Sequence, residues 1–133
     1  MSQLLAIVAG GSVGAVARFW VANAVYAWIG RDFPYGTLVV NVSGALCIGL
    51  LSEVLLQRFA FSAEARAALM IGFLGAYTTF STFALETIYL LEAGSWVKAV
   101  VNVVASVILC LLAVWGGILA GRYLTTQFIA RWL

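Results

Sequence analysis

Residues 75–86 read GAYTTFSTFALE and place five hydroxyl side chains, two phenylalanines and one carboxylate inside an apolar stretch, 67–91. That stretch is longer than the about 20 residues that an α-helix needs to cross a hydrocarbon core of about 30 Å. Gly72 and Gly75 are followed by β-branched and hydroxylated residues, which weaken a helix and offer substitute hydrogen bonds. We therefore expect a membrane helix that is broken near its middle, between Gly75 and Thr79.

The rest of the sequence contains three more apolar stretches of similar length. The chain has 133 residues, of which 65% are hydrophobic and 9% charged, and it has no histidine. Soluble domains carry about 25% charged residues, and the uniform apolar runs do not alternate as the strands of a membrane β-barrel do. The sequence therefore predicts an all-α membrane protein with a single four-helix transmembrane domain over residues 1–133, with spans at 4–28, 36–56, 67–91 and 96–123.

Aromatic and glycine residues fit this arrangement of spans. Tyr26, near the end of the first span, is interpreted as one of the aromatic residues that lie at membrane–water interfaces. Gly10 with Gly14, and Gly117 with Gly121, are pairs of small residues one helical turn apart, which let helix backbones approach closely. We expect tight helix packing at these glycines.

Basic residues near the span ends are few and bear on the orientation in the membrane. Those on the side of both termini are Arg58, Arg66, Arg122 and Arg131, and those on the other side are Arg31 and Lys98. Basic residues are enriched on the cytoplasmic side, so the bias toward cytoplasmic termini is small. Insertion in both orientations is then credible, which leads us to expect an antiparallel homodimer with dual topology. The net charge of +2 gives no indication of a nucleic-acid partner.

Ionisable and amide side chains at membrane depth are expensive and are therefore candidates for function. Arg18 stays charged. It either forms an ion pair with Glu86 or Glu53 or lines a cationic vestibule that attracts anions. Asn41 in the second span either joins two helices by hydrogen bonding or lines a polar path. Asn102 in the fourth span likewise either forms a hydrogen bond between helices or lines a polar path.

The polar residues around the expected break suggest ion chemistry. Backbone carbonyls released by a broken membrane helix can coordinate a small cation such as Na⁺ or K⁺. Phe80 and Phe83 lie three residues apart, which is typical of core packing, but the positive edge of an aromatic ring can also solvate an anion. At 100° per residue, Thr37 shares a face of its helix with Asn41, and Ser106 shares one with Asn102.

The segments GGSVGAVARF (10–19), PYGTLVVNVSG (34–44) and GAYTTFSTF (75–83) occur in this order over four spans. In this they resemble the Fluc/CrcB fluoride channel family, and the resemblance covers essentially the whole chain. It implies an antiparallel dual-topology dimer in the bacterial inner membrane, with two fluoride pores and a structural Na⁺ at the dimer centre.

The resemblance also implies roles for individual residues. Asn41 would lie on the pore, where Phe80 and Phe83 present their ring edges to fluoride, and Ser106 would add a hydroxyl. Backbone carbonyls of Gly75 and Thr78 from both subunits would hold the Na⁺. The other pathway positions that we assign are Thr37, Thr79, Ser81, Thr82 and Glu86, with Arg18 in the vestibule.

The sequence leaves three functions open. The first is a passive channel that exports fluoride. The second is a proton-coupled exporter of lipophilic cations, similar to small multidrug transporters, for which Glu86 is the one deep carboxylate. The third is a structural membrane subunit without transport activity. We do not expect an enzyme, because the sequence shows no nucleophile with a base, no cluster of metal ligands and no histidine.

Overall fold

The fold was obtained as a computed structural model that describes residues 1–57 and 61–132. Every regular element in these residues is helical. The elements are α1 (Ser2–Ile29), α2 (Tyr35–Gln57), α3 (Ala63–Arg66), the π-helix η1 (Ala67–Leu74), α4 (Gly75–Tyr77), α5 (Phe80–Glu92) and α6 (Trp96–Trp132). The third span comprises α3, η1, α4 and α5. Four stretches are long and apolar enough to cross a membrane: Ser2–Ile29, Tyr35–Leu55, Ala63–Glu92 and Trp96–Gln127. The predicted all-helical fold with four spans is confirmed.

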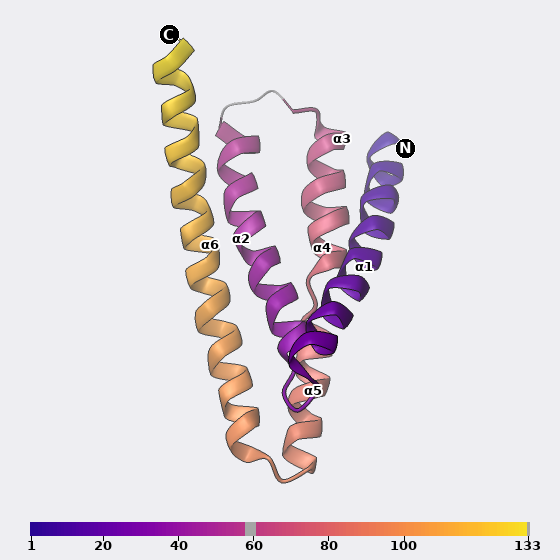
Figure 1. The fold of residues 1–133 in the computed structure, drawn as a ribbon. Helices are drawn as coiled ribbons and strands as arrows, with labels where there is room; N and C mark the ends of the chain where they lie inside the picture. Colours follow the sequence, from indigo (N-terminus) through magenta and orange to yellow (C-terminus); the bar gives the residue numbers. More distant parts are fainter. Residues whose placement is uncertain (58–60, 133) are drawn as a thin grey trace.

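The spans pack in two closely fitting pairs, α2 with α6 and α1 with the first half of the third span. The start of α1 and the end of α6 lie at the same end of the molecule, and the turn between α5 and α6 lies at the other end (Figure 1). Glycines allow the close approach. A Cβ at Gly117 would meet the Leu46 carbonyl, and one at Gly14 would meet the Phe73 carbonyl. The expected packing at these glycines is therefore present.

The third span is bent at Thr78 and Thr79. Ser62 caps its first turn, because the Ser62 hydroxyl accepts a hydrogen bond from the Ala65 N–H at 3.2 Å. The backbone then remains helical through Tyr77 but is extended at Thr78 (φ −79°, ψ 157°) and Thr79 (φ −150°, ψ 118°). The two halves meet at this point in Figure 1. Gly75, where we expected the irregular segment to begin, has helical angles (φ −64°, ψ −34°).

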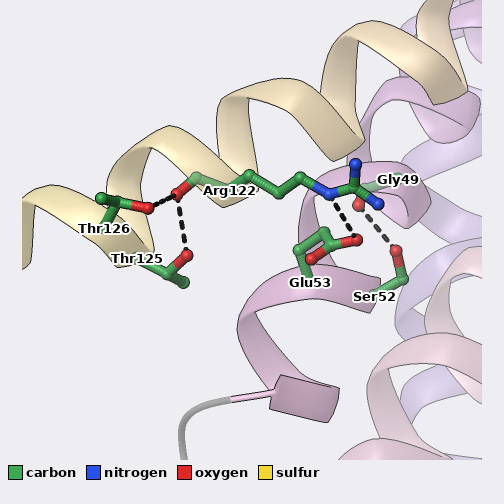
Figure 2. A network of polar contacts seen from close by, with 6 residues as sticks. All are labelled: Gly49, Ser52, Glu53, Arg122, Thr125 and Thr126. Carbon is green, nitrogen blue, oxygen red and sulfur yellow. Dashed lines mark hydrogen bonds and ion pairs between the residues drawn. The ribbon is translucent and has the colours of Figure 1, made fainter.

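An ion pair joins α2 to α6 near the end that carries the termini (Figure 2). Arg122 Nε donates to Glu53 Oε1 at 3.2 Å, and Glu53 is 7% exposed. The Arg122 carbonyl accepts from the hydroxyls of Thr125 and Thr126 at 2.9 and 2.8 Å. A buried carboxylate requires a partner, and α6 supplies it here. The pair between Arg18 and Glu53 considered above is therefore not formed.

Two basic residues used for the orientation argument cannot be placed in this fold. Arg58 lies outside the described residues, and the described part of α6 does not include the side chain of Arg131. Arg66 ends α3 and Arg122 lies in α6. The preference for one orientation therefore remains a prediction from the sequence.

Candidate functional site

An open cavity of about 450 Å³ lies where α2, the bend and α6 meet. We call it the phenylalanine cavity, because Phe80 and Phe83 line it together with Asn41, Thr79 and Ser106. These five residues were all assigned to the pathway from the sequence. They come from three different spans, which the fold brings together.

Asn41 holds the bend through two hydrogen bonds to one residue. Its Oδ1 accepts from the Thr79 N–H at 2.7 Å, and its Nδ2 donates to the Thr79 carbonyl at 2.9 Å. An amide side chain carries one acceptor and two donors, so it can satisfy both backbone groups of an extended residue. Unpaired backbone groups in a membrane cost several kcal/mol each. Asn41 is therefore what makes extended backbone tolerable at this depth.

The bend also changes the pairing of two carbonyls. In a continuous α-helix the N–H groups of Thr79 and Thr82 would donate to the carbonyls of Gly75 and Thr78, four residues back. Here the Thr79 N–H donates to Asn41, and the Thr82 N–H donates to Thr79 Oγ1 at 3.2 Å. The carbonyls of Gly75 and Thr78 are thus released from helical pairing.

The two phenylalanines differ in exposure. Their ring centroids lie 5.3 Å apart with an interplanar angle of 51°. Phe83 is 8% exposed, whereas Phe80 is 79% exposed on the single chain. Ser106 is 7% exposed, and its Oγ is buried without a hydrogen-bond partner among the described residues. Ser106 thus belongs to the lining of the cavity, and its hydroxyl is not engaged by another of the described residues.

A second cavity of about 300 Å³, which we call the arginine cavity, is lined by Arg18, Thr37, Thr82 and Glu86 among others. It shares Thr79 with the phenylalanine cavity. Glu86 Oε1 accepts from Thr37 Oγ1 at 2.9 Å and from the Tyr26 hydroxyl at 2.9 Å. Glu86 is thus held by hydroxyls, and the pair with Arg18 considered from the sequence is not formed.

A third cavity of about 250 Å³ lies against the connection between α1 and α2. We call it the loop cavity, and its lining includes Arg31, Asp32 and Tyr89. It shares Tyr26 and Glu86 with the arginine cavity. The three cavities therefore form a series, with Thr79 at one boundary and Tyr26 with Glu86 at the other.

Comparison with known proteins identifies the family. Residues 5–118 match the family model described as "CrcB-like protein, Camphor Resistance (CrcB)". The chain belongs to the CrcB family. Together with the four helices that are able to span a membrane, this makes it a multi-pass membrane protein.

Three similar proteins are each named "Fluoride-specific ion channel FluC". The CrcB chain is 59% identical to the Methylococcus capsulatus protein, over 96% of this chain and 56% of that relative, so it spans about half of that protein's length. It is 54% identical to the Geobacter sulfurreducens protein, over 93% of this chain and 100% of the relative. It is 52% identical to the Hydrogenovibrio crunogenus protein, over 90% of this chain and 91% of the relative. None of these three names supports the alternative of a lipophilic-cation exporter.

Ser81 and Asn102 line none of the three cavities described. Ser81 is exposed, and its hydroxyl lies 3.3 Å from Thr79 Oγ1. Asn102 is 1% exposed and donates to Thr87 Oγ1 at 2.9 Å. Asn102 therefore joins α6 to α5, which is the packing alternative considered for it.

Sequence reasoning missed Tyr26, which it interpreted only as an interfacial aromatic residue. In the structure its hydroxyl contacts Glu86 and Thr37. The spacing of Tyr26 could have indicated this position. Arg18, Ala22 and Tyr26 follow one another at intervals of four residues, so Tyr26 lies near the same face of α1 as the candidate vestibule residue Arg18.

Proposed function

We propose that this chain is a passive, fluoride-selective channel that exports fluoride across the bacterial inner membrane. The relatives described above carry the name of such a channel. The observation that carries the proposal is the phenylalanine cavity, where Asn41 holds extended backbone beside two aromatic rings and an unpartnered Ser106 hydroxyl. A channel of this kind needs no catalytic group, which agrees with the expectation that the chain is not an enzyme.

The chemistry of the cavity suits a small, strongly hydrated anion. A selective pore must replace the water around the ion while binding it weakly enough to let it leave. Ring edges of Phe80 and Phe83 are partially positive, and the Ser106 hydroxyl is a neutral donor. Such groups solvate fluoride without the full positive charge that would trap it.

Arg18 acts in the neighbouring arginine cavity. A cationic cleft with low-dielectric walls raises the local concentration of anions. Thr37, Thr82 and Glu86 line the same cavity, and Thr79 connects it to the phenylalanine cavity. Fluoride would therefore be attracted by Arg18 and then pass Thr79 to reach Phe83.

The direction of transport follows from the membrane potential. Moving one charge across it is worth about 2.3 kcal/mol per 100 mV. A potential that is negative inside therefore drives an anion outward. Fluoride that accumulates in the cytoplasm can therefore leave through a passive channel, without transport of a coupled ion.

The functional unit in this proposal is an antiparallel homodimer. Phe80 is 79% exposed on the single chain, although it lines the phenylalanine cavity. Gly75 is exposed as well. A second copy packed against this face would cover both residues and close the cavity. Opposite insertion of the two copies would give each membrane face the same pore entrance.

The released carbonyls fit a structural Na⁺ at the centre of that dimer. Na⁺ is a hard cation that unwound backbone carbonyls coordinate in membrane proteins, and the carbonyls of Gly75 and Thr78 are released by the bend. A Cβ built at Gly75 would come no closer than 3.9 Å to another atom, the Met70 carbonyl oxygen. There is thus room at this position. When bound, the ion would link the bent spans of the two subunits.

The proposal is tested by fluoride efflux from liposomes that contain the purified protein. We expect efflux of fluoride but not of chloride, and loss of fluoride efflux in Phe83→Ile and Phe80→Ile. Trp115→Leu is the matched control, because Trp115 is 62% exposed on α6 and lines none of the cavities described. Wild-type efflux that is equal for both halides, or unchanged efflux in both phenylalanine variants, would refute the proposal.

A further inference from the structure

Tyr26 stands between two cavities that both contain a cationic side chain. Arg18 lines the arginine cavity and Arg31 lines the loop cavity. The two cavities share Tyr26 and Glu86 in their linings. The tyrosine ring and the carboxylate therefore lie at the boundary where the two cavities adjoin.

The ring of Tyr26 is held at both its hydroxyl and its face. The hydroxyl donates to Glu86 Oε1 at 2.9 Å and lies 3.3 Å from Thr37 Oγ1. The guanidinium carbon of Arg31 lies 4.7 Å from the ring centroid, within the distance of a cation–π contact. Arg31 is itself fixed by a 3.0 Å hydrogen bond from its Nη2 to Asn23 Oδ1.

The Tyr26 ring lies against Gly36 of α2, and we expect its contacts to be released by rotation of the side chain alone. A tyrosine side chain changes position by rotation about two side-chain bonds, between staggered rotamers at the first of them. Thr37 still donates to Glu86 Oε1 when Tyr26 leaves, so the carboxylate keeps one partner. The phenolic O–H, freed from Glu86, then becomes a donor for the passing anion.

We propose that Tyr26 is the gate for anions between the arginine cavity and the loop cavity, latched by Glu86 and Arg31. The identity of the anion as fluoride rests on the proposed function. The gate itself rests on the lining of the two cavities and on the contacts of the ring. It makes Tyr26 a residue that limits flux at the end of the pathway farthest from the phenylalanine cavity.

Thiol accessibility tests the gate without any transport measurement. Ala22 lines the arginine cavity, so Ala22→Cys, in a chain whose Cys47 and Cys110 are replaced by alanine, reports on access to it. The probe is the anionic reagent 2-sulfonatoethyl methanethiosulfonate, applied to the full-length protein in detergent. We expect modification to be at least tenfold faster with Tyr26→Ala than with Tyr26 in place, and intermediate with Tyr26→Phe.

The control for this assay is Ala93→Cys in the exposed turn between α5 and α6. Its modification rate should be the same with and without Tyr26→Ala. Equal modification of Ala22→Cys in all three backgrounds would overturn the gate. Tyr26→Phe keeps the ring and loses one hydroxyl, so it provides the comparison if Tyr26→Ala does not fold.

Fluoride efflux provides the second readout and separates the two proposals. We expect Tyr26→Ala to raise efflux several-fold and Tyr26→Phe to raise it less. Wild-type protein without fluoride efflux would refute the proposed function while the thiol assay still decides the gate. Fluoride efflux in the wild type that is unchanged in both Tyr26 variants would refute the gate alone.

Discussion

Helix α2 supplies a polar side chain to two regions of the molecule, and the two regions use it differently. At the seam with α6, Glu53 is matched by Arg122 and lines none of the cavities described. At the bend, Asn41 pairs with both backbone groups of Thr79 and lines a cavity of about 450 Å³. At the seam a charge is cancelled between two helices. At the bend, Asn41 satisfies both backbone groups of Thr79. The carbonyls of Gly75 and Thr78 are left without their helical hydrogen bonds.

This difference indicates how a membrane protein separates packing from transport. Polar groups that join helices have a partner on the neighbouring helix: Asn102 pairs with Thr87, and Glu53 pairs with Arg122 through Oε1, while its Oε2 is buried without a partner among the described residues. In the proposed pathway Asn41 is engaged by Thr79, whereas the Ser106 hydroxyl has no partner among the described residues.

The largest expected effect comes from removing the residue that holds the bend. In Asn41→Leu the Thr79 N–H loses its acceptor and is expected to return to the Gly75 carbonyl, which straightens the span. Loss of two hydrogen bonds worth about 1–1.5 kcal/mol each corresponds to a fall in fluoride efflux of about 100-fold. The measurement is efflux from liposomes at equal protein content. Asn41→Gln is the matched control, since it retains an amide acceptor and donor at this position without adding a charge, and its efflux should be intermediate.

Breaking the ion pair between Glu53 of α2 and Arg122 of α6 is expected to lower stability without changing transport. Arg122→Met leaves the Glu53 carboxylate buried without its partner, which costs about 3–5 kcal/mol for a fully buried pair. The Arg122 side chain is 62% exposed, so screening by water reduces the loss to about 2 kcal/mol. Denaturation in detergent measures it, and efflux per folded protein should equal that of the wild type. Glu53→Gln combined with Arg122→Met should recover most of the stability, and a double variant as unstable as the single one would contradict this account.

The smallest effect is expected from a single hydroxyl. Ser106→Ala removes one neutral donor from the phenylalanine cavity and breaks no hydrogen bond between the described residues. A neutral hydrogen bond is worth about 1 kcal/mol, so fluoride efflux should fall about fivefold with unchanged stability. Ser43→Ala is the control, because the Ser43 hydroxyl lies 2.8 Å from that of Tyr77 and contacts no cavity described. It should lower stability and leave the halide preference unchanged.

Much of the candidate site was predictable because its local signals are strong. The run of hydroxylated residues after Gly75 marked the region of irregular backbone to within a few residues, since these side chains compete locally for backbone hydrogen bonds. The resemblance to channel segments placed Asn41, Phe83 and Ser106 together. Ser81 was assigned to the pathway together with its neighbours, but on the single chain it is exposed and lines none of the described cavities, so its role stays a prediction.

Partners across the bundle were not predictable in the same way. Asn41 meets Thr79 across 38 positions, Glu53 meets Arg122 across 69, and Tyr26 meets Glu86 across 60. From the sequence, either Glu53 or Glu86 could form an ion pair with Arg18. In the structure Glu53 pairs with Arg122, and Glu86 accepts hydrogen bonds from Tyr26 and Thr37. A tyrosine near a helix end was indistinguishable from an interfacial anchor until its hydroxyl could be placed.

The sequence by itself determined that this chain has four stretches able to cross a membrane, and that the third of them bends near Thr78 and Thr79. Both are local properties, because hydropathy sums over about 20 neighbouring residues and the competition for backbone hydrogen bonds involves side chains a few positions away. Only the tertiary structure decided which polar groups are neutralised and which face a cavity. That choice depends on how each helix is rotated about its axis, which close packing of glycines against neighbouring backbones sets once the four helices are assembled.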